Sequence, residues 1–189
     1  MTIKSQHVLH RRHSIKTMKQ GDEWQARAFR GKMAIGEVST APTEEAAILV
    51  VKRQLDEAAS KQRMLRGGDG FPTSDEVRAA LPHLKFSKAQ DAMLAAHLQA
   101  PDHVLTATQL AEAAGYDDYV VANAQYGQLG RALAEELDWE PKKKTAGKTV
   151  WTFTLATDAN SNARDKGEEI SGHWRWKLRP EIVAALTDS

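Results

Sequence analysis

The chain is divided by one short glycine-rich segment, Gly67-Gly68-Asp69-Gly70-Phe71-Pro72. Glycine and proline at this density are typical of a connection between domains, and no other stretch of the sequence has a linker-like composition. The segment also separates two halves of opposite charge, because residues 1–66 hold 13 Lys+Arg against 7 Asp+Glu and residues 67–189 hold 13 against 18. We therefore predict two small domains, at residues 1–66 and 74–189, joined by a linker over residues 67–73.

Composition excludes several classes of protein. A chain of 189 residues with 41% hydrophobic content can bury one core of ordinary size or two small ones. The absence of cysteine excludes disulfides, thiolate nucleophiles and cysteine-based zinc sites. The sequence has no apolar run of about eighteen residues and no charged-then-apolar leader at Met1, so we expect a cytoplasmic protein without a membrane span.

The first half alternates between apolar and polar residues, as paired strands do. Strands are expected at residues 8–17, 23–29 and 32–39, with hairpin turns at residues 19–22 and 30–31. On the middle strand, Trp24, Ala26 and Ala28 would share one face, and Gln25, Arg27 and Phe29 the other. Thr43 is a suitable N-cap for a following helix. The pattern predicts a β-β-β-α domain.

Positive charge is concentrated in these strands. Residues 1–36 carry eight Lys+Arg and only two Asp+Glu, which is typical of a surface that binds a polyanion. We expect phosphate contacts from Arg11, Arg12, Lys16, Arg27 and Arg30. An alternative is that these charges protect an exposed strand from pairing with other strands.

Three histidines in the same region, His7, His10 and His13, raise the question of a metal site. On one continuous strand His10 would face away from the other two, and no acidic residue or cysteine lies near them in the sequence. We therefore expect no metal there. The chain also lacks a phosphate-binding glycine loop and the common hydrolase and metalloprotease motifs, so we expect no enzymatic activity and no cofactor.

The second half begins with helical patterns at residues 74–81 and 87–99, followed by a short extended piece at 103–105. Two more helices are expected within residues 105–137, divided by Gly115. Strands follow at 149–155 and 173–178, joined by a polar connection over 157–172, and a last helix at 180–186. The predicted fold class is α+β.

The helix after Gly115 contains two internal glycines, Gly127 and Gly130. Each costs about 1 kcal/mol relative to alanine, so something is expected to approach the bare backbone closely. A phosphate backbone would make these glycines part of a DNA contact, and a second helix of the same domain would make them part of the core. Nearby, Asn123 and Gln128 can read adenine and Arg131 can read guanine, so these three residues are candidate DNA contacts together with the glycines.

The order of elements resembles a winged helix-turn-helix domain. Thr106-Ala107-Thr108-Gln109-Leu110-Ala111 with Gly115 is similar to its first helix and turn. The segments 122–131 and 176–181 further resemble a domain found beside HNH nucleases in restriction-like bacterial proteins, although no HNH motif is present. The resemblance implies DNA recognition without cleavage. On the strand 173–178, Trp174 and Trp176 would share one face and Arg175 and Lys177 the other. With Lys142, Lys143, Lys144 and Lys148, the cations of that strand are expected to form a basic rim at the wing.

The first domain is similar in outline to the three-strand-plus-helix modules of phage integrase arms and plant ethylene-response factors, in which the sheet lies in the major groove. The matching residues are 23–28 on the middle strand, Gly36, and 43–46 at the helix start. The same pattern also fits HicB-type antitoxins and double-stranded-RNA-binding folds.

From these observations we predict a non-catalytic DNA-binding protein of bacterial or phage type, with duplex DNA as the partner of both modules. One alternative is an inhibitor or adaptor of a mobile element that binds a bacterial defence or regulatory protein through the acidic domain. A nuclease with an unrecognised site is a further alternative.

Overall fold

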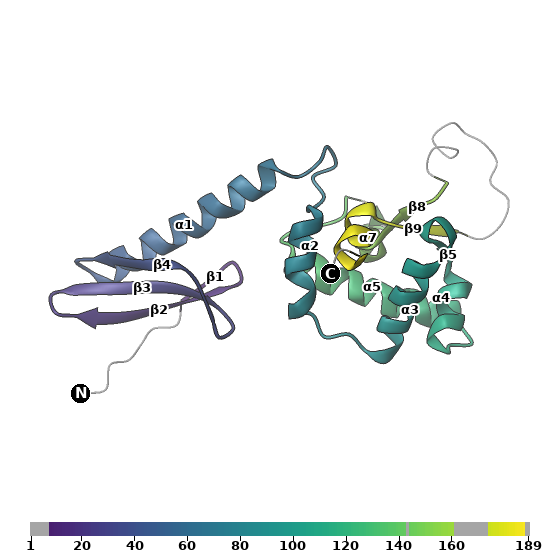
Figure 1. Ribbon diagram of the computed structural model, residues 1–189, viewed down its shortest axis with the longest axis horizontal. Coiled ribbons are helices and arrows are strands. Elements are labelled where there is room, and N and C mark those ends of the chain that lie inside the picture. The colour runs from purple at the N-terminus through teal and green to yellow at the C-terminus, as the bar shows by residue number, and fades with distance from the viewer. Residues whose placement is uncertain (1–7, 143, 161–173, 188–189) are drawn as a thin grey trace. The chain divides into compact units, whose positions relative to one another are not determined.

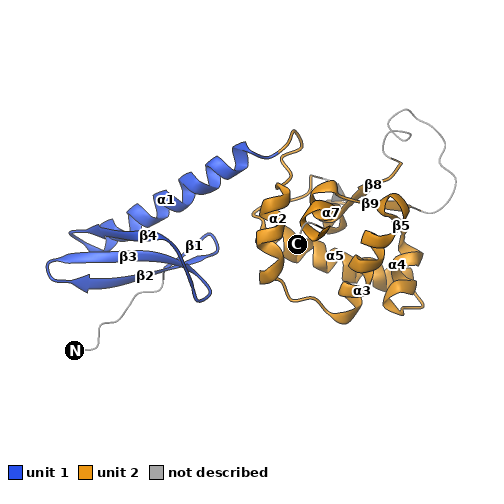
Figure 2. Cartoon of the chain, viewed as in Figure 1, with its two compact units in different colours: residues 1–66 blue, residues 67–189 orange. Residues whose placement is uncertain are grey.

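The computed structural model describes residues 8–142, 144–160 and 174–187. The chain has a mixed α+β structure and divides into two compact units, residues 1–66 and 67–189 (Figure 2). Each unit has its own hydrophobic core.

The first unit is a four-stranded antiparallel sheet in the order β1-β2-β3-β4, with one long helix against one face (Figure 1). Its elements are β1 (Val8–His10), β2 (His13–Gln20), β3 (Glu23–Arg30), β4 (Met33–Ala41) and α1 (Glu44–Met64). Thr43 caps α1 as predicted, since its side chain accepts a hydrogen bond from the backbone N–H of Ala46.

The prediction of three strands was wrong, because the first expected strand is two. A tight turn at Arg11 and Arg12 divides it, and Arg11 takes a positive φ of 52°. His10 therefore pairs directly with His13 on the neighbouring strand, instead of facing away from it. The alternating pattern continues through the turn, which is why the sequence reads as one strand.

On the middle strand, β3, the side that faces α1 is built from small residues. Ala26 and Ala28 are buried against α1, while Arg27 and Phe29 point to the other side, as the alternation predicted. The helix contributes Ala47, Ile48, Val51 and Leu55 to this core. Beyond Leu55 the remaining turns of α1 bury no residue.

The second unit combines helices with a small sheet. Its elements are α2 (Ser74–Ala80), a 3-10 turn (Leu81–His83), α3 (Lys88–Gln99), a 3-10 turn (Pro101–His103), β5 (Val104–Thr106), α4 (Ala107–Ala114), α5 (Tyr119–Glu136), β6 (Lys144–Thr145), β7 (Lys148–Thr149), the 3-10 helix η3 (Trp151–Thr154), β8 (Ala156–Asp158), β9 (Arg175–Leu178) and α7 (Pro180–Thr187). The strands form an antiparallel sheet in the order β5-β9-β8 and a separate β6–β7 hairpin.

The helices of this unit begin and end where the sequence indicates. Ser87 and Thr106 both form capping boxes, and Gly115 ends α4 in the left-handed conformation with φ 72°. The predicted apolar stripe of α5 is buried as a whole: Ala122, Tyr126, Leu129, Leu133 and Leu137.

A buried hydrogen-bond chain joins α3, α5 and β9. His97 is fully buried, with Nδ1 2.7 Å from the hydroxyl oxygen of Tyr126 and Nε2 3.0 Å from the carbonyl oxygen of Trp176. A carbonyl oxygen only accepts, so Nε2 carries the proton and Nδ1 accepts from the tyrosine hydroxyl. Burial lowers the pKa of His97 and raises that of Tyr126, so both groups stay neutral.

The predicted linker is shorter than expected. Phe71 is buried in the second core, and Asp69 accepts a hydrogen bond of 2.9 Å from Arg179, whose guanidinium lies 4.0 Å from the centroid of the Phe71 ring. Thr73 forms the capping box of α2. Residues 69–73 are therefore part of the second unit, because a phenylalanine in a glycine-rich stretch still gains by burial.

The predicted strand at residues 149–155 was wrong. Of these residues only Thr149 belongs to a strand, as the end of β7, and η3 occupies residues 151–154. The cause lies in α5: a Cβ placed on Gly130 would be only 2.2 Å from the carbonyl oxygen of Trp151. The bare backbone of Gly130 thus admits the backbone of η3, and this contact overrides the strand preference of the alternating Thr, Val, Trp and Phe residues.

The two helix glycines are expected to respond oppositely to alanine. Gly130→Ala forces backbone atoms apart and should lower the free energy of unfolding by about 1–3 kcal/mol. A Cβ at Gly127 would meet only Thr152 Oγ1, at 3.8 Å, so Gly127→Ala should raise it by up to about 1 kcal/mol through helix propensity. Urea denaturation of both variants measures the difference, and equal effects of the two substitutions would contradict this account.

Burial of neutral His97 should make stability depend on pH. Its folded pKa is depressed, so below the unfolded value of about 6.5 the unfolded state binds a proton that the folded state does not. The contribution of His97 to the free energy of unfolding should therefore be constant above about pH 7 and fall by about 1.4 kcal/mol per pH unit below 6.5, until the folded pKa is reached. Urea titrations at several pH values should show a smaller acid slope for His97→Gln than for the unchanged chain, since His13 is present in both. An identical slope in the two proteins would mean that the pH dependence of stability comes from groups other than His97.

Candidate nucleic-acid interface

The side of the first sheet that α1 leaves uncovered carries two cations directly opposite each other. Lys16 on β2 pairs with Arg27 on β3, and the next pair on the same face is Ser14 with Phe29. Lys16 Nζ lies 4.7 Å from the centroid of the Phe29 ring, and Arg27 Nε donates to the carbonyl oxygen of Gly36 at 3.0 Å. Among the described residues neither cation is paired with a carboxylate.

Gly36 lies in an irregular part of β4, and its carbonyl oxygen orients the side chain of Arg27. The register between β3 and β4 shifts between Ala26 and Ala28, so the bulged strand passes beside Arg27. Gly36 adopts a φ of 63°, a conformation that favours glycine. The carbonyl oxygen that orients the Arg27 guanidinium is therefore presented by the bulge.

The other predicted cations of this unit gather at one end of the sheet. Arg11 Nε donates to Asp56 on α1 at 2.6 Å, so part of its charge is neutralised there. Burial, and then the nearby charge of Arg12, lower the pKa of Arg30. Burial likewise lowers the pKa of His13, followed by the charges of Arg30, His10 and Arg11. Arg11 and Arg12 form the turn between β1 and β2, and Arg30 ends β3 beside the start of β2, so the three cations lie at one end of the sheet.

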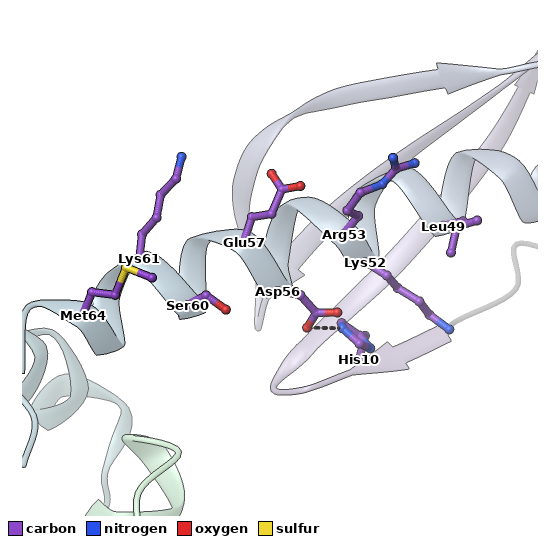
Figure 3. Close-up of a pocket in the computed structure, with 9 residues that line it drawn as sticks. All are labelled: His10, Leu49, Lys52, Arg53, Asp56, Glu57, Ser60, Lys61 and Met64. Atoms are coloured by element: carbon purple, nitrogen blue, oxygen red, sulfur yellow. Dashed lines mark hydrogen bonds and ion pairs between the residues drawn. The ribbon is translucent and has the colours of Figure 1, made fainter. Parts of the chain in front are cut away.

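Asp56 also accepts a hydrogen bond of 2.9 Å from His10, at one side of a surface depression along α1 (Figure 3). The depression has a volume of about 640 Å³. Its lining includes Lys52, Arg53 and Lys61 but also the carboxylates of Asp56 and Glu57. A surface of both signs does not select a polyanion, so this depression is not our candidate site.

In the second unit, most of the predicted residues of α5 line one groove. The groove has a volume of about 540 Å³ and lies between α5, the β6–β7 hairpin and η3. From α5 it is lined by Asn123, Ala124, Gly127, Gln128 and Arg131, and from the opposite wall by Thr145, Lys148, Thr149, Val150, Trp151, Thr152 and Trp176.

The groove combines an aromatic surface with charged and amide groups. The guanidinium of Arg131 lies 5.7 Å from the centroid of the Trp151 ring, and its Nε is 2.8 Å from Glu135. This ion pair is exposed on both sides, so it contributes little and leaves the guanidinium able to turn toward a ligand. Lys148 is exposed on the hairpin.

Gly130 differs from the other candidates because it is buried beneath Trp151. The group that approaches the bare backbone of Gly130 closely is the backbone of Trp151, which belongs to the same domain. Burial by this contact rules out a DNA contact at Gly130. Gly127 lines the groove, so only this glycine of the pair can face a ligand.

The predicted basic rim is only partly within the described residues. Lys142 is exposed, Lys144 begins β6, and Lys143 lies outside the described residues. Arg175 is exposed on β9, while Trp176 on the same strand is buried, which is the alternation the sequence predicted. The sequence reasoning did not select Trp151 and Thr149, because a predicted strand would not have placed them against α5.

The described residues hold no group of three or more His, Asp or Glu side chains arranged to bind a metal, and His7 lies outside them. Within the same part of the chain, no helix has the length and apolar character needed to cross a membrane. Neither a protein-family model, nor a curated protein sequence, nor a solved structure matches this chain.

Proposed function

We propose that the protein binds duplex DNA without cleaving it, and that the exposed face of the first sheet is its main contact. The observation that carries the proposal is the Lys16–Arg27 pair. Like charges directly opposite each other on a sheet destabilise it, and neither side chain is paired with a described carboxylate. A phosphate backbone across this face would turn that repulsion into two attractions.

The charge balance of the unit supports a polyanion. Residues 1–66 hold 13 Lys+Arg against 7 Asp+Glu. By the alternation of β3, Arg30 lies on the side of Ala26 and Ala28, so the exposed face is represented by Lys16 and Arg27, and Phe29 adds an apolar contact beside Lys16. Such a surface binds the backbone without regard to sequence, while polar side chains such as Gln25 offer groups that can contact base edges.

The second unit would then supply a further contact. Its order α3, β5, α4, α5, β8, β9 with the sheet order β5-β9-β8 supports the proposal of a winged helix, in which the helix corresponding to α5 enters the major groove. The exposed residues Gln128 and Arg131 on α5, and Arg175 and Lys142 beyond it, support this assignment. The negative balance of this unit limits it to a local contact.

Removing the two opposed cations should weaken DNA binding specifically. In the Lys16→Ala/Arg27→Ala variant we expect at least a tenfold loss of affinity for a random duplex at low salt, with the slope of log affinity against log salt reduced by about 1.8. Fluorescence anisotropy over a salt series measures both quantities, and thermal unfolding checks that the β4 bulge survives the loss of Arg27.

A charge-matched control separates this face from net charge alone. Arg53→Ala/Lys61→Ala removes the same charge from the depression along α1 (Figure 3). This control should retain most of the affinity. Equal losses in the two variants would mean that no particular face is used, and no binding by the unchanged chain at low salt would reject the DNA function.

A second candidate function is a protein-binding inhibitor or adaptor. It is favoured by the first turn of α5, where Tyr119, Val120 and Val121 are 54%, 56% and 42% exposed. Asp117 and Asp118 precede them, and acidic residues repel a phosphate backbone. Consecutive exposed apolar side chains on an acidic unit suit a basic protein surface, such as the nucleic-acid site of a bacterial defence protein.

The two functions predict different effects for Val120→Asp/Val121→Asp. If α5 docks a protein, the variant should lose stoichiometric capture of a bacterial protein while its DNA affinity stays unchanged. If α5 enters the major groove, the added carboxylates should weaken DNA binding by about tenfold or more through repulsion. Affinity capture followed by anisotropy on the same preparations distinguishes the two.

A further inference from the structure

We infer that the groove between α5 and the β6–β7 hairpin holds one unpaired base of a DNA strand, with the ring of the base against Trp151. The inference rests on the proposed DNA function and adds the kind of DNA structure that the second unit recognises. It is carried by the size of the groove, by the direction of Asn123 and by the chemistry of the opposite wall.

The groove has the size of a small-ligand site. Its volume of about 540 Å³ falls within the range of about 300–1,000 Å³ that is usual for such sites. A double helix is much larger and can only lie across the mouth. A single base turned out of the stack can enter, as it does in proteins that extrude a nucleotide from a duplex.

Asn123 faces the closed side of α5. Asn123, Gly127 and Gly130 follow one another at intervals of four and three residues, so they share a side of the helix. That side is the one that the backbone of η3 covers at Gly130. Asn123 is accordingly half-buried, whereas Gln128 is exposed. The amide of Asn123 thus borders the groove, where it can pair with the polar edge of a base.

Gly127 keeps the space between Asn123 and the opposite wall open. A Cβ there would lie 3.8 Å from Thr152 Oγ1, so a larger side chain at this position would extend into the groove. With glycine, the helix backbone itself forms part of the wall. Gly130 is required for close packing within the domain, but Gly127 is not. Binding of a ligand in the groove would explain why glycine is present at position 127.

The opposite wall offers stacking and a phosphate contact. Trp151 lines the groove and is not among the aromatic side chains packed against the core of the unit. Trp151 is half-buried, and stacking on an aromatic ring is the usual way in which proteins hold an unpaired base. Arg131 lies at the same ring, and Lys148 on β7 can bind the phosphate next to the base.

The test compares two probes with the full chain. One is a fully paired duplex, and the other is the same duplex with one extra, bulged nucleotide. Because a bulged base needs no unpairing before it enters the groove, we expect it to raise the affinity about tenfold, which corresponds to about 1.4 kcal/mol. Fluorescence anisotropy at one salt concentration gives the ratio of the two affinities.

Variants in the groove should change this ratio. Trp151→Ala should bring it to about one, and Trp151→Phe should keep most of the preference because an aromatic face remains. Tyr119→Ala is the control, since Tyr119 is an exposed aromatic residue at the start of α5 that does not line the groove. It should leave the ratio unchanged even if it alters both affinities.

A second variant guards against misfolding. If Trp151→Ala lowers the melting temperature of the unit, the Asn123→Asp variant tests the inference instead. Its carboxylate in the groove repels a DNA strand, and the Trp151 side chain is kept. Its ratio should also fall to about one. A preference for the bulged probe that persists in both variants would overturn the inference.

Failure of the inference differs from failure of the proposed function. Binding of the paired duplex with a ratio of one in the unchanged chain would overturn the base site alone and would assign the groove to a protein side chain. Absence of binding to both probes at low salt would reject the DNA function itself.

Discussion

The arrangement of the second unit depends on the contact between the bare backbone of Gly130 and the carbonyl group of Trp151. No other residue could accept a carbonyl oxygen 2.2 Å from the position of its Cβ. The contact holds η3 against α5, and η3 in turn brings the β6–β7 hairpin alongside the helix. The wall that this creates faces Asn123 and Gly127. The structural role of one glycine therefore produces the groove in which the other glycine can have a functional role.

The rest of the unit is held by polar groups that link segments far apart in the sequence. His97 connects α3 to Tyr126 of α5 and to the backbone of β9. Arg179 connects the end of β9 to Asp69 and to the carbonyl oxygen of Phe153. Each of these groups is useful only when all its partners are in place, because an unpaired buried polar group is costly. They fix α5 and η3 as the two walls of the groove.

The sequence predicted local features well and long-range contacts poorly. Caps at Thr43, Ser87 and Thr106, the corner at Gly115 and the buried stripe of α5 follow from short-range rules, and the structure has all of them. The turn at Arg11 was missed because it does not interrupt the alternation of residues. The strand at 149–155 was wrong, and Trp151 was missed as a groove residue, because both depend on Gly130, which is about twenty residues away in the sequence. The docking of Phe71 depends on Arg179, farther still.

The opposite charges of the two units bear on how such a protein would find its target. A basic sheet alone binds any duplex through counterion release and shows little preference among sites. An acidic unit joined to it lowers that general attraction but leaves Lys148 and Arg131 close to a groove with aromatic and amide groups. The weak contacts of the first unit with many phosphates and the selective contact of the second unit with one base would then combine only at DNA sites that offer both. If the proposed function holds, the first unit would set the affinity for DNA and the second unit would set the choice of site.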